Sequence, residues 1–196
     1  MGRKALLARY TRYSCSALVV AFLNCVIVTI GTSAAAVPVV NVKLPGGIFQ
    51  GEVSFQGTQR PVATFRGIPY AAPPTGDLRW RPPEHPKPWR PRILRSSHNP
   101  GCVQVKHDTP HGRIVGDEDC LVMSVFAPHP MNTSAKLPVL FWIHGGGYQV
   151  GSGSGVDSDG SYNVGNLDAP MIIVVINYRL NVFGFAASDV LRCVRE

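Results

Sequence analysis

Short hydrophobic runs separated by turn residues follow residue 36, and they predict β-strands. Val39 to Leu44 and Ile48 to Phe55 are rich in β-prone residues, and Pro45 to Gly47 separates them. Two such runs joined by a few turn residues are typical of an antiparallel β-hairpin. Val62 to Ile68 predicts a third strand.

Three more hydrophobic runs lie in the second half of the chain, namely Leu121 to Phe126, Val139 to His144 and Met171 to Asn177. The last two are almost continuously apolar, which is typical of strands covered on both faces by helices. Gly145 to Gly165, which lies between them, is too rich in glycine for a regular helix over most of its length. An antiparallel start followed by buried strands predicts a mixed-sheet α/β domain.

The composition and the charge of the 196-residue chain limit the classes of protein to which it can belong. With 45% hydrophobic and 16% charged residues the chain is a folded protein, and the eight prolines from Pro69 to Pro91 predict an irregular segment that wraps the surface. The net charge of +7 could indicate a nucleic-acid-binding protein. However, the residues from 37 onward carry 15 basic and 12 acidic side chains. We therefore expect no nucleic-acid partner.

The other four basic residues begin a pattern that predicts a secretory signal peptide at 1–36. Arg3, Lys4, Arg9 and Arg12 precede the apolar run from Ala17 to Ile30, and small residues up to Ala36 follow. The alternative is a membrane anchor, but a run of 14 residues is shorter than the ~20 that span a bilayer. We therefore expect a secreted protein without a stable anchor. Asn132, in the sequence Asn-Thr-Ser, then becomes a glycosylation acceptor.

Three consecutive glycines are the strongest indication of a catalytic site in the sequence. Gly145, Gly146 and Gly147 follow His144 at the end of a predicted buried strand, and Tyr148 comes next. Glycines in a row let backbone amides face a reacting oxygen without interference from side chains, as an oxyanion hole requires. An ordinary tight turn is the alternative, but it needs only one or two glycines. The sequence therefore predicts an oxyanion hole of the type found in lipases and esterases.

Five short segments occur in an order that identifies a family. They are Phe65 to Ala71, Leu78 to Pro83, Glu118 to Leu121, His144 to Tyr148, and Asn177 to Leu180. With these segments the chain resembles the type B carboxylesterases and lipases, which include the cholinesterases, from about Gly46 to Ser188. Val122 and Met123 depart from the family pattern, which has an aromatic and then an aliphatic residue there.

This resemblance implies a fold and a reaction. The fold would be the amino-terminal part of an α/β-hydrolase, with a mixed, mostly parallel central sheet preceded by a small antiparallel β-hairpin region. Residues 37–196 would form this partial domain. The reaction would be the hydrolysis of small-molecule or lipid esters through an acyl-serine intermediate, and it needs neither a cofactor nor a metal.

The resemblance also implies roles for individual residues. Gly146 and Gly147 would donate the two loop N–H groups of the oxyanion hole. Cys102 and Cys120 would form a disulfide. Arg79 and Glu118 match a pair that forms a structural salt bridge in the family.

The 196-residue sequence does not contain the catalytic residues of an esterase active site. The fold places its serine in a Gly-x-Ser-x-Gly turn, followed by an acid and a histidine. No serine of the chain has glycine two residues before and two residues after it, and the glycine- and serine-rich stretch from Gly151 to Gly155 has the wrong spacing. We therefore expect this stretch to be a flexible loop, and we expect the 196-residue chain to be inactive by itself.

Two other functions fit some of the residues. A non-catalytic cholinesterase-like adhesion or binding module would also lack the serine. A small metal-binding protein could use the array Cys102, His107, His111 and Cys120, although its spacing does not fit the common zinc-finger patterns. We expect His144 to serve as a turn or core histidine, and Asp117 to Asp119 to make structural pairings.

Overall fold

The structure is a computed structural model and describes residues 37–55, 57–89, 93–97 and 101–188. The predicted signal peptide at 1–36, with the alternative anchor inside it, lies outside the described residues. Within the described ranges, no helix is long and apolar enough to cross a membrane.

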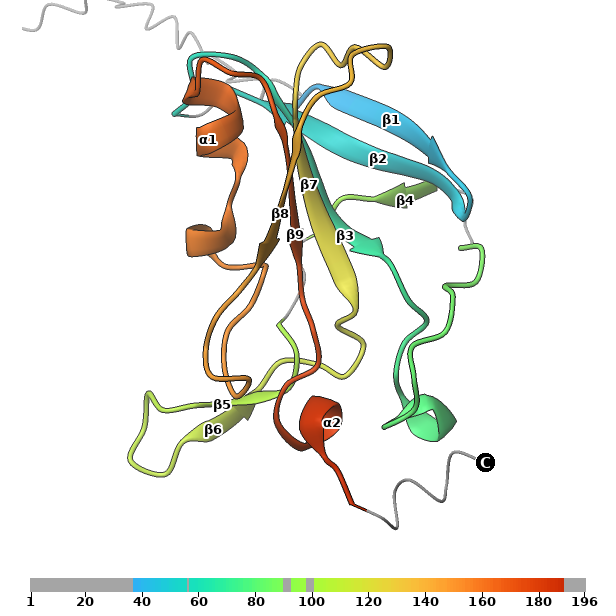
Figure 1. The fold of residues 1–196 in the computed structure, drawn as a ribbon, viewed down its shortest axis with the longest axis vertical. Helices are drawn as coiled ribbons and strands as arrows, with labels where there is room; N and C mark the ends of the chain where they lie inside the picture. The colour runs from blue at the N-terminus through green and yellow to red at the C-terminus, as the bar shows by residue number, and fades with distance from the viewer. Residues whose placement is uncertain (1–36, 56, 90–92, 98–100, 189–196) are drawn as a thin grey trace, which may run out of the picture. The chain divides into compact units, whose positions relative to one another are not determined.

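A seven-stranded sheet organises the described part of the chain (Figure 1). Its main path runs β1 (Val39–Leu44), β2 (Gly47–Ser54), β3 (Val62–Pro69), β7 (Val122–Pro128), β9 (Ile172–Ile176) and β8 (Val139–Ile143). The remaining strand, β4 (Ile93–Arg95), pairs with β2, and β5 (Gln104–Lys106) and β6 (Arg113–Val115) form a separate hairpin. The helical segments are η1 (Gly76–Leu78), η2 (Val156–Ser158), α1 (Ser161–Asn166) and α2 (Asn181–Phe185).

All six hydrophobic runs of the sequence form strands, and their ends lie within two residues of the predicted ones. The predicted strand directions are wrong in detail. We expected a mostly parallel central sheet, and the described strands are mostly antiparallel. Along the main path only β8 and β9 are parallel, and β4 pairs with β2 in parallel. Neighbours joined by short connections pair antiparallel, as β1 and β2 do, whereas β8 and β9 are joined by a long crossover that contains α1. The predicted hairpin is also an integral part of the main sheet.

The two faces of the sheet carry separate cores. On one face α1 packs on β3 and β7, and its Val164 meets Phe126 and Ile173 in a buried cluster (Figure 1). The other core contains Phe49, Ala63, Phe65 and Ile68. Side chains alternate between the two faces of a strand, so β3 contributes Val62 to the first core and Ala63 to the second.

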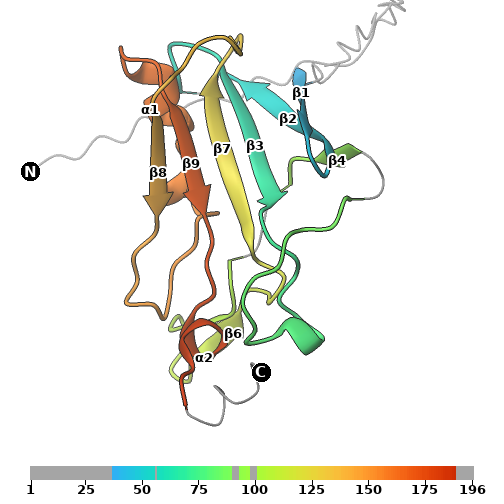
Figure 2. The same ribbon diagram turned by 45° about the vertical axis from the view of Figure 1, so that its right-hand side comes forward.

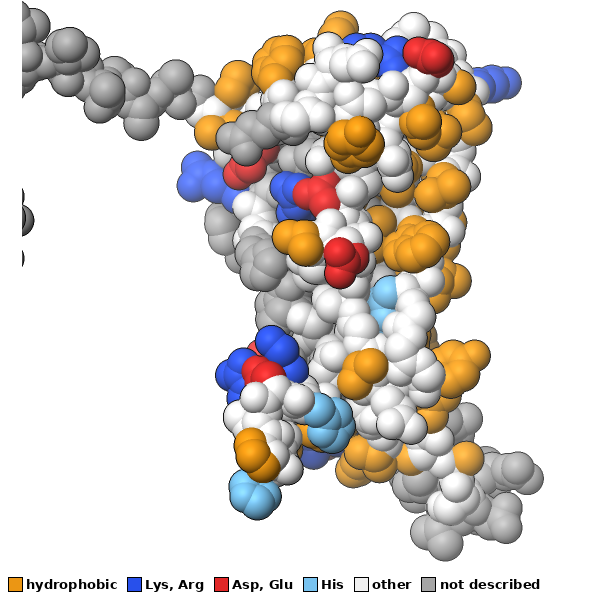
Figure 3. Space-filling model, turned by 90° about the vertical axis from the view of Figure 1, so that its left-hand side faces the viewer, with side chains coloured by type: hydrophobic (Ala, Val, Ile, Leu, Met, Phe, Trp, Pro, Cys, Tyr) orange, Lys and Arg blue, Asp and Glu red, His pale blue; other side chains and the backbone are white. Residues whose placement is uncertain are grey.

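The last strand of the path differs from the others. All five residues of β8 are 47–59% exposed, although the continuous apolar run predicted a strand that is buried on both faces. Figure 2 shows β8 at the margin of the sheet, and among the described strands it pairs with β9 alone. Figure 3 shows hydrophobic side chains down the margin where this strand lies. The expectation of a buried strand is therefore wrong for β8 in the described residues.

An ion pair ties the sheet to the segment before α1. Nη2 of Arg66 in β3 donates to Oδ2 of Asp159 at 2.6 Å, and the guanidinium lies 5.4 Å from the ring centre of Phe126. Oδ1 of Asp159 accepts the backbone N–H of Ser161 at 2.8 Å. Burial by itself would raise the pKa of Asp159, but the hydrogen bonds from Ser161 and the charge of Arg66 outweigh it and hold the pKa below its ordinary value.

We predict that Asp159→Asn lowers the free energy of unfolding near neutral pH by about 1 kcal/mol, because both side chains of the pair are about one-third exposed and solvent screens them. A folded pKa below the unfolded one makes this stabilisation complete above the unfolded value, about 3.9. It is then lost as the pH falls toward the folded pKa.

Urea unfolding at several pH values measures the effect, and the difference between Asp159→Asn and wild type should shrink below about pH 4. Asp157→Asn is the matched control, because Asp157 is exposed in η2 of the same segment. An equal loss of stability in both variants, or a loss that does not depend on pH, would contradict the assignment.

Candidate functional site

The candidate site is the turn that leaves β8 at its carboxyl end, His144 to Tyr148. Its backbone takes positive φ angles at Gly146 (+123°), Gly147 (+59°) and Tyr148 (+61°). Glycine adopts such angles without strain, but a bulky residue such as tyrosine does so rarely. The surroundings of Tyr148 must therefore hold it in place.

Gly146 is required by close backbone packing as well as by its φ angle. A Cβ atom at this position would collide with the carbonyl of Val150, whereas a Cβ at Gly145 would meet open space. The Gly146 carbonyl accepts the N–H groups of Gln149 and Val150, each at 3.1 Å. Among the described residues, nothing accepts a hydrogen bond from the N–H groups of Gly146 or Gly147. The turn thus has two neighbouring backbone donors that are not used internally.

His144 supports the turn through its buried side chain. Its side chain is buried and stacks on Tyr178, with ring centres 4.4 Å apart, and the Tyr178 hydroxyl donates to the His144 carbonyl at 2.8 Å. Nδ1 of His144 lies 2.9 Å from the Gly145 carbonyl oxygen. This packing agrees with the expected role of a core histidine and accounts for the aromatic residue in the Asn177 to Leu180 segment.

Tyr148 is held by the start of α2. Its carbonyl accepts the N–H of Asn181 at 2.9 Å, and Nδ2 of Asn181 donates to the carbonyl of Gln149 at 2.8 Å. The Tyr148 ring packs on Phe185, with ring centres 4.8 Å apart. Sequence reasoning missed Asn181 as a positioning residue, because its place beside the turn depends on the crossover between β8 and β9.

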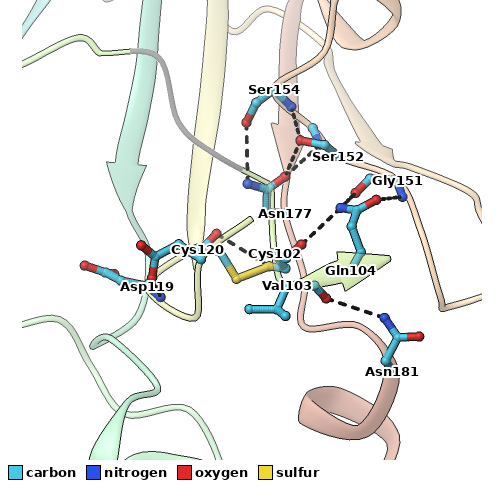
Figure 4. Close-up of a disulfide and its surroundings, with 12 residues drawn as sticks. Cys102, Val103, Gln104, Asp119, Cys120, Gly151, Ser152, Ser154, Asn177 and Asn181 are labelled. Atoms are coloured by element: carbon cyan, nitrogen blue, oxygen red, sulfur yellow. Dashed lines mark hydrogen bonds between the residues drawn. A yellow bond between two sulfur atoms is a disulfide. The ribbon is translucent and has the colours of Figure 1, made fainter. Parts of the chain in front are cut away.

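The loop from Gly151 to Gly155 is anchored at several points. The buried Asn177, just after β9, accepts the N–H of Gly153 at 2.7 Å through Oδ1. Gln104 forms two hydrogen bonds with the backbone of Gly151, at 2.8 and 2.9 Å (Figure 4). The prediction of a flexible loop is therefore wrong, because the side chains of Asn177 and Gln104, both distant in sequence, supply the hydrogen bonds.

Cys102 and Cys120 form the disulfide that the family resemblance implied, and both residues are buried. Gln104 donates to the Cys102 carbonyl at 3.0 Å as well as binding Gly151, so the disulfide-closed loop and the glycine-rich loop share one side chain (Figure 4). The disulfide uses both sulfur atoms, so these cysteines cannot act as thiolate ligands of zinc.

Arg79 and Glu118 form a two-pronged ion pair. Nε and Nη2 of Arg79 each donate to one oxygen of Glu118 at 2.6 Å. The hydrogen bonds that Arg79 donates to Glu118, and then the charge of Glu118, raise the pKa of Arg79. The neighbouring Asp119 donates its N–H to Asp117, and burial followed by the charge of Asp117 raises the pKa of Asp119. These contacts are structural pairings, as expected for Asp117 to Asp119.

The predicted glycosylation acceptor lies in an exposed bend after β7. Oδ1 of Asn132 accepts the N–H of Ser134 at 3.0 Å. Its side chain is exposed, so the position is accessible to modification.

The sheet order, the crossover and the glycine turn define an α/β-hydrolase. Residues 36–193 match the family model described as the carboxylesterase family. This chain belongs to the carboxylesterase family.

Individual relatives agree with this assignment. The chain is 39% identical over 138 residues to juvenile hormone esterase of Tribolium castaneum, and 36% identical over 186 residues to carboxylesterase 1E of Rattus norvegicus. These matches cover 70% and 88% of this chain but 23% and 31% of the two relatives. Aspergillus niger EstA matches its structure with a TM-score of 0.65 and 33% identity, over 82% of this chain and 29% of that one. The chain thus spans less than a third of the length of these proteins.

We predict that the glycines of the turn respond differently to the same substitution. Gly146→Ala should lower the free energy of unfolding by about 2 kcal/mol, because it adds a Cβ at a strained φ against the Val150 carbonyl. Gly145→Ala, the matched control, should change it by less than about 0.5 kcal/mol. Urea unfolding compares the two, and equal losses would show that the turn does not have this conformation.

We also predict that the disulfide is important for stability. Replacing Cys102 and Cys120 together by alanine should cost about 3 kcal/mol, because the bridge restricts the loop between them in the unfolded chain. Reducing the wild-type protein should cost the same, which separates loss of the bridge from an effect of the side chains. Non-reducing peptide mapping should find Cys102 joined to Cys120, and a bridge from either one to Cys193 would refute this pairing.

Proposed function

We propose that this chain carries the oxyanion-binding half of the active site of a carboxylic ester hydrolase. The observation that supports it is the pair of backbone N–H groups at Gly146 and Gly147, which have no acceptor among the described residues. When a nucleophile attacks an ester, the carbonyl oxygen gains negative charge in the tetrahedral intermediate. Two preorganised N–H donors stabilise that charge and thereby lower the barrier.

The contacts around the turn support this role. His144, Tyr178 and Asn181 fix the backbone through stacking and hydrogen bonds, so the donors would not need to reorganise during the reaction. The carbonyl of Gly146 binds Gln149 and Val150, which orients the peptide planes of the turn. Preorganisation of this kind is what gives an oxyanion hole its effect in water-excluded sites.

We assign the other active-site residues, namely the nucleophile, the acid and the base, to the rest of a longer protein. No serine in the 196 residues stands in a Gly-x-Ser-x-Gly turn. We therefore propose that the complete protein forms an acyl-serine intermediate on small-molecule or lipid esters, and that this chain alone has no esterase activity. Two donors without an activated nucleophile leave only a small fraction of a triad's rate.

We further propose that residues 1–36 direct secretion and that residues 37–196 form the partial hydrolase domain. The disulfide between Cys102 and Cys120 supports an oxidising compartment, since such bridges rarely persist in the cytosol. The exposed Asn132 would then carry a glycan. A shift in mass after treatment of the secreted protein with an N-glycosidase would test this, with Asn132→Gln as the control.

A chimaera tests the proposed role of the turn. Residues 37–188 of this chain would replace the matching segment of Aspergillus niger EstA, which has 33% identity to it. We expect the chimaera to hydrolyse a short-chain activated ester and the isolated chain to leave it intact. In the chimaera, Gly146→Ala should lower kcat by about 100-fold or more with little change in KM, because the donors act on the transition state.

Two controls accompany this experiment. Gly145→Ala in the same chimaera should retain activity, since that position accepts a Cβ. Titration with a serine-directed phosphonate counts the correctly folded sites, so a loss of kcat per titrated site cannot come from misfolding. Turnover by the isolated chain that the phosphonate abolishes would overturn the proposal, as would an unchanged kcat in Gly146→Ala.

A further inference from the structure

The side-chain amide of Gln104 joins the disulfide-closed loop to Gly151, just after the turn that leaves β8 (Figure 4). Its Oε1 accepts the N–H of Gly151 at 2.9 Å, and its Nε2 donates to the carbonyls of Gly151 at 2.8 Å and Cys102 at 3.0 Å. Among the described residues, no other group forms a hydrogen bond with the backbone of Gly151. The hydrogen bonds that fix Gly151 therefore all come from Gln104.

Gln104 is itself firmly anchored. It begins β5, which pairs with β6. The carbonyl that it binds belongs to Cys102, which is buried, forms the disulfide with Cys120 and makes a backbone bridge with Asp117. A side chain held by its own strand at one end and by the Cys102 carbonyl at the other has little freedom to move, so it keeps Gly151 in one place.

Gly151 packs directly against the start of the turn. A Cβ at Gly151 would collide with Nδ1 of His144 and with the carbonyl oxygen of Gly145. Its φ of +118° also favours glycine. A planar trans peptide points its C=O and its N–H in opposite directions. Because the Gly145 carbonyl lies against Gly151, the Gly146 N–H of the same peptide points away from it.

The same rule applies to the peptide that joins Val150 to Gly151. Gln104 holds the N–H of this peptide, so the Val150 carbonyl points the other way, toward Gly146, where no Cβ fits. The Val150 N–H also donates to the Gly146 carbonyl at 3.1 Å, which directs the N–H of Gly147 away from Val150. A shift of Gly151 would therefore move both N–H groups of the proposed oxyanion hole.

We propose that Gln104 is a positioning residue for the oxyanion hole. It acts through Gly151 and holds the N–H groups of Gly146 and Gly147 in the direction that the developing oxyanion requires. This inference rests on the proposed esterase function and adds to it a residue of β5, outside the turn. The hydrogen bonds between Gln104 and Gly151 are only partly buried, so water can replace them when the side chain is lost. Water satisfies the backbone of Gly151 without fixing it, and the loss should therefore affect the rate more than the stability.

Gln104→Met in the chimaera with Aspergillus niger EstA tests this role, because methionine is nearly as long as glutamine but has no amide. We expect kcat per phosphonate-titrated site to fall about 10-fold with little change in KM, since the donors are displaced in the transition state. The matched control is Gln50→Met. The Gln50 amide also makes side-chain hydrogen bonds, but with Asn41 of β1 and Arg95 of β4, so this variant should retain its kcat.

The outcomes separate this inference from the function on which it rests. An unchanged kcat per titrated site in Gln104→Met, or an equal loss in Gln50→Met, would overturn the positioning role. Gly146→Ala is measured in the same chimaera. If it lowers kcat while Gln104→Met does not, only the role of Gln104 is wrong. If neither variant lowers kcat, the proposed oxyanion hole is wrong as well.

A second measurement needs no activity and uses the 196-residue chain itself. In nuclear magnetic resonance spectra of isotope-labelled protein, the amide resonances of Gly146 and Gly147 should move in Gln104→Met and stay in place in Gln50→Met. Dispersed resonances from the rest of the sheet show that both variants are folded. Unchanged resonances of Gly146 and Gly147 in Gln104→Met would show that Gln104 does not influence the turn, and would overturn the inference whatever the chimaera does.

Discussion

The close approach of two backbone segments in the turn after β8 is the constraint on which the candidate site depends. The chain reverses so tightly that Gly146 lies against the carbonyl of Val150, where no side chain fits. This geometry gives the turn its positive φ angles and leaves two N–H groups without an acceptor among the described residues. A looser turn with ordinary residues would fold more easily but would lack the adjacent free donors.

Such a turn needs support from outside its own sequence, and residues from two separate segments supply it. Tyr178 and Asn181 follow β9 and bind the turn through its carbonyls, while Gln104 reaches in from β5 to hold Gly151. The disulfide between Cys102 and Cys120 fixes the loop from which Gln104 extends. Stability and site geometry are therefore coupled, because the contacts that close the fold also orient the donors.

In contrast to the well-supported turn, the strand at the margin of the sheet has few contacts. β8 leads directly into the turn, yet within the part of the chain that the structure describes it pairs on one side and exposes all its apolar side chains. Apolar surface of this kind is stable in water only when something covers it. The strand that leads into the turn and the exposed apolar margin of the sheet are therefore the same five residues.

The sequence by itself determined the strands, the glycine turn and the family. Hydrophobic runs and turn residues act locally, so the bounds of β1 and β3 could be predicted to within two residues. The sequence could not determine which strands are neighbours, because pairing depends on contacts between distant segments. The antiparallel majority of the sheet, the anchoring of the Gly151 to Gly155 loop by Asn177 and Gln104, and the exposure of β8 were decided by tertiary structure alone. An apolar run indicates that a strand can be buried, and only the packing of its neighbours decides whether it is.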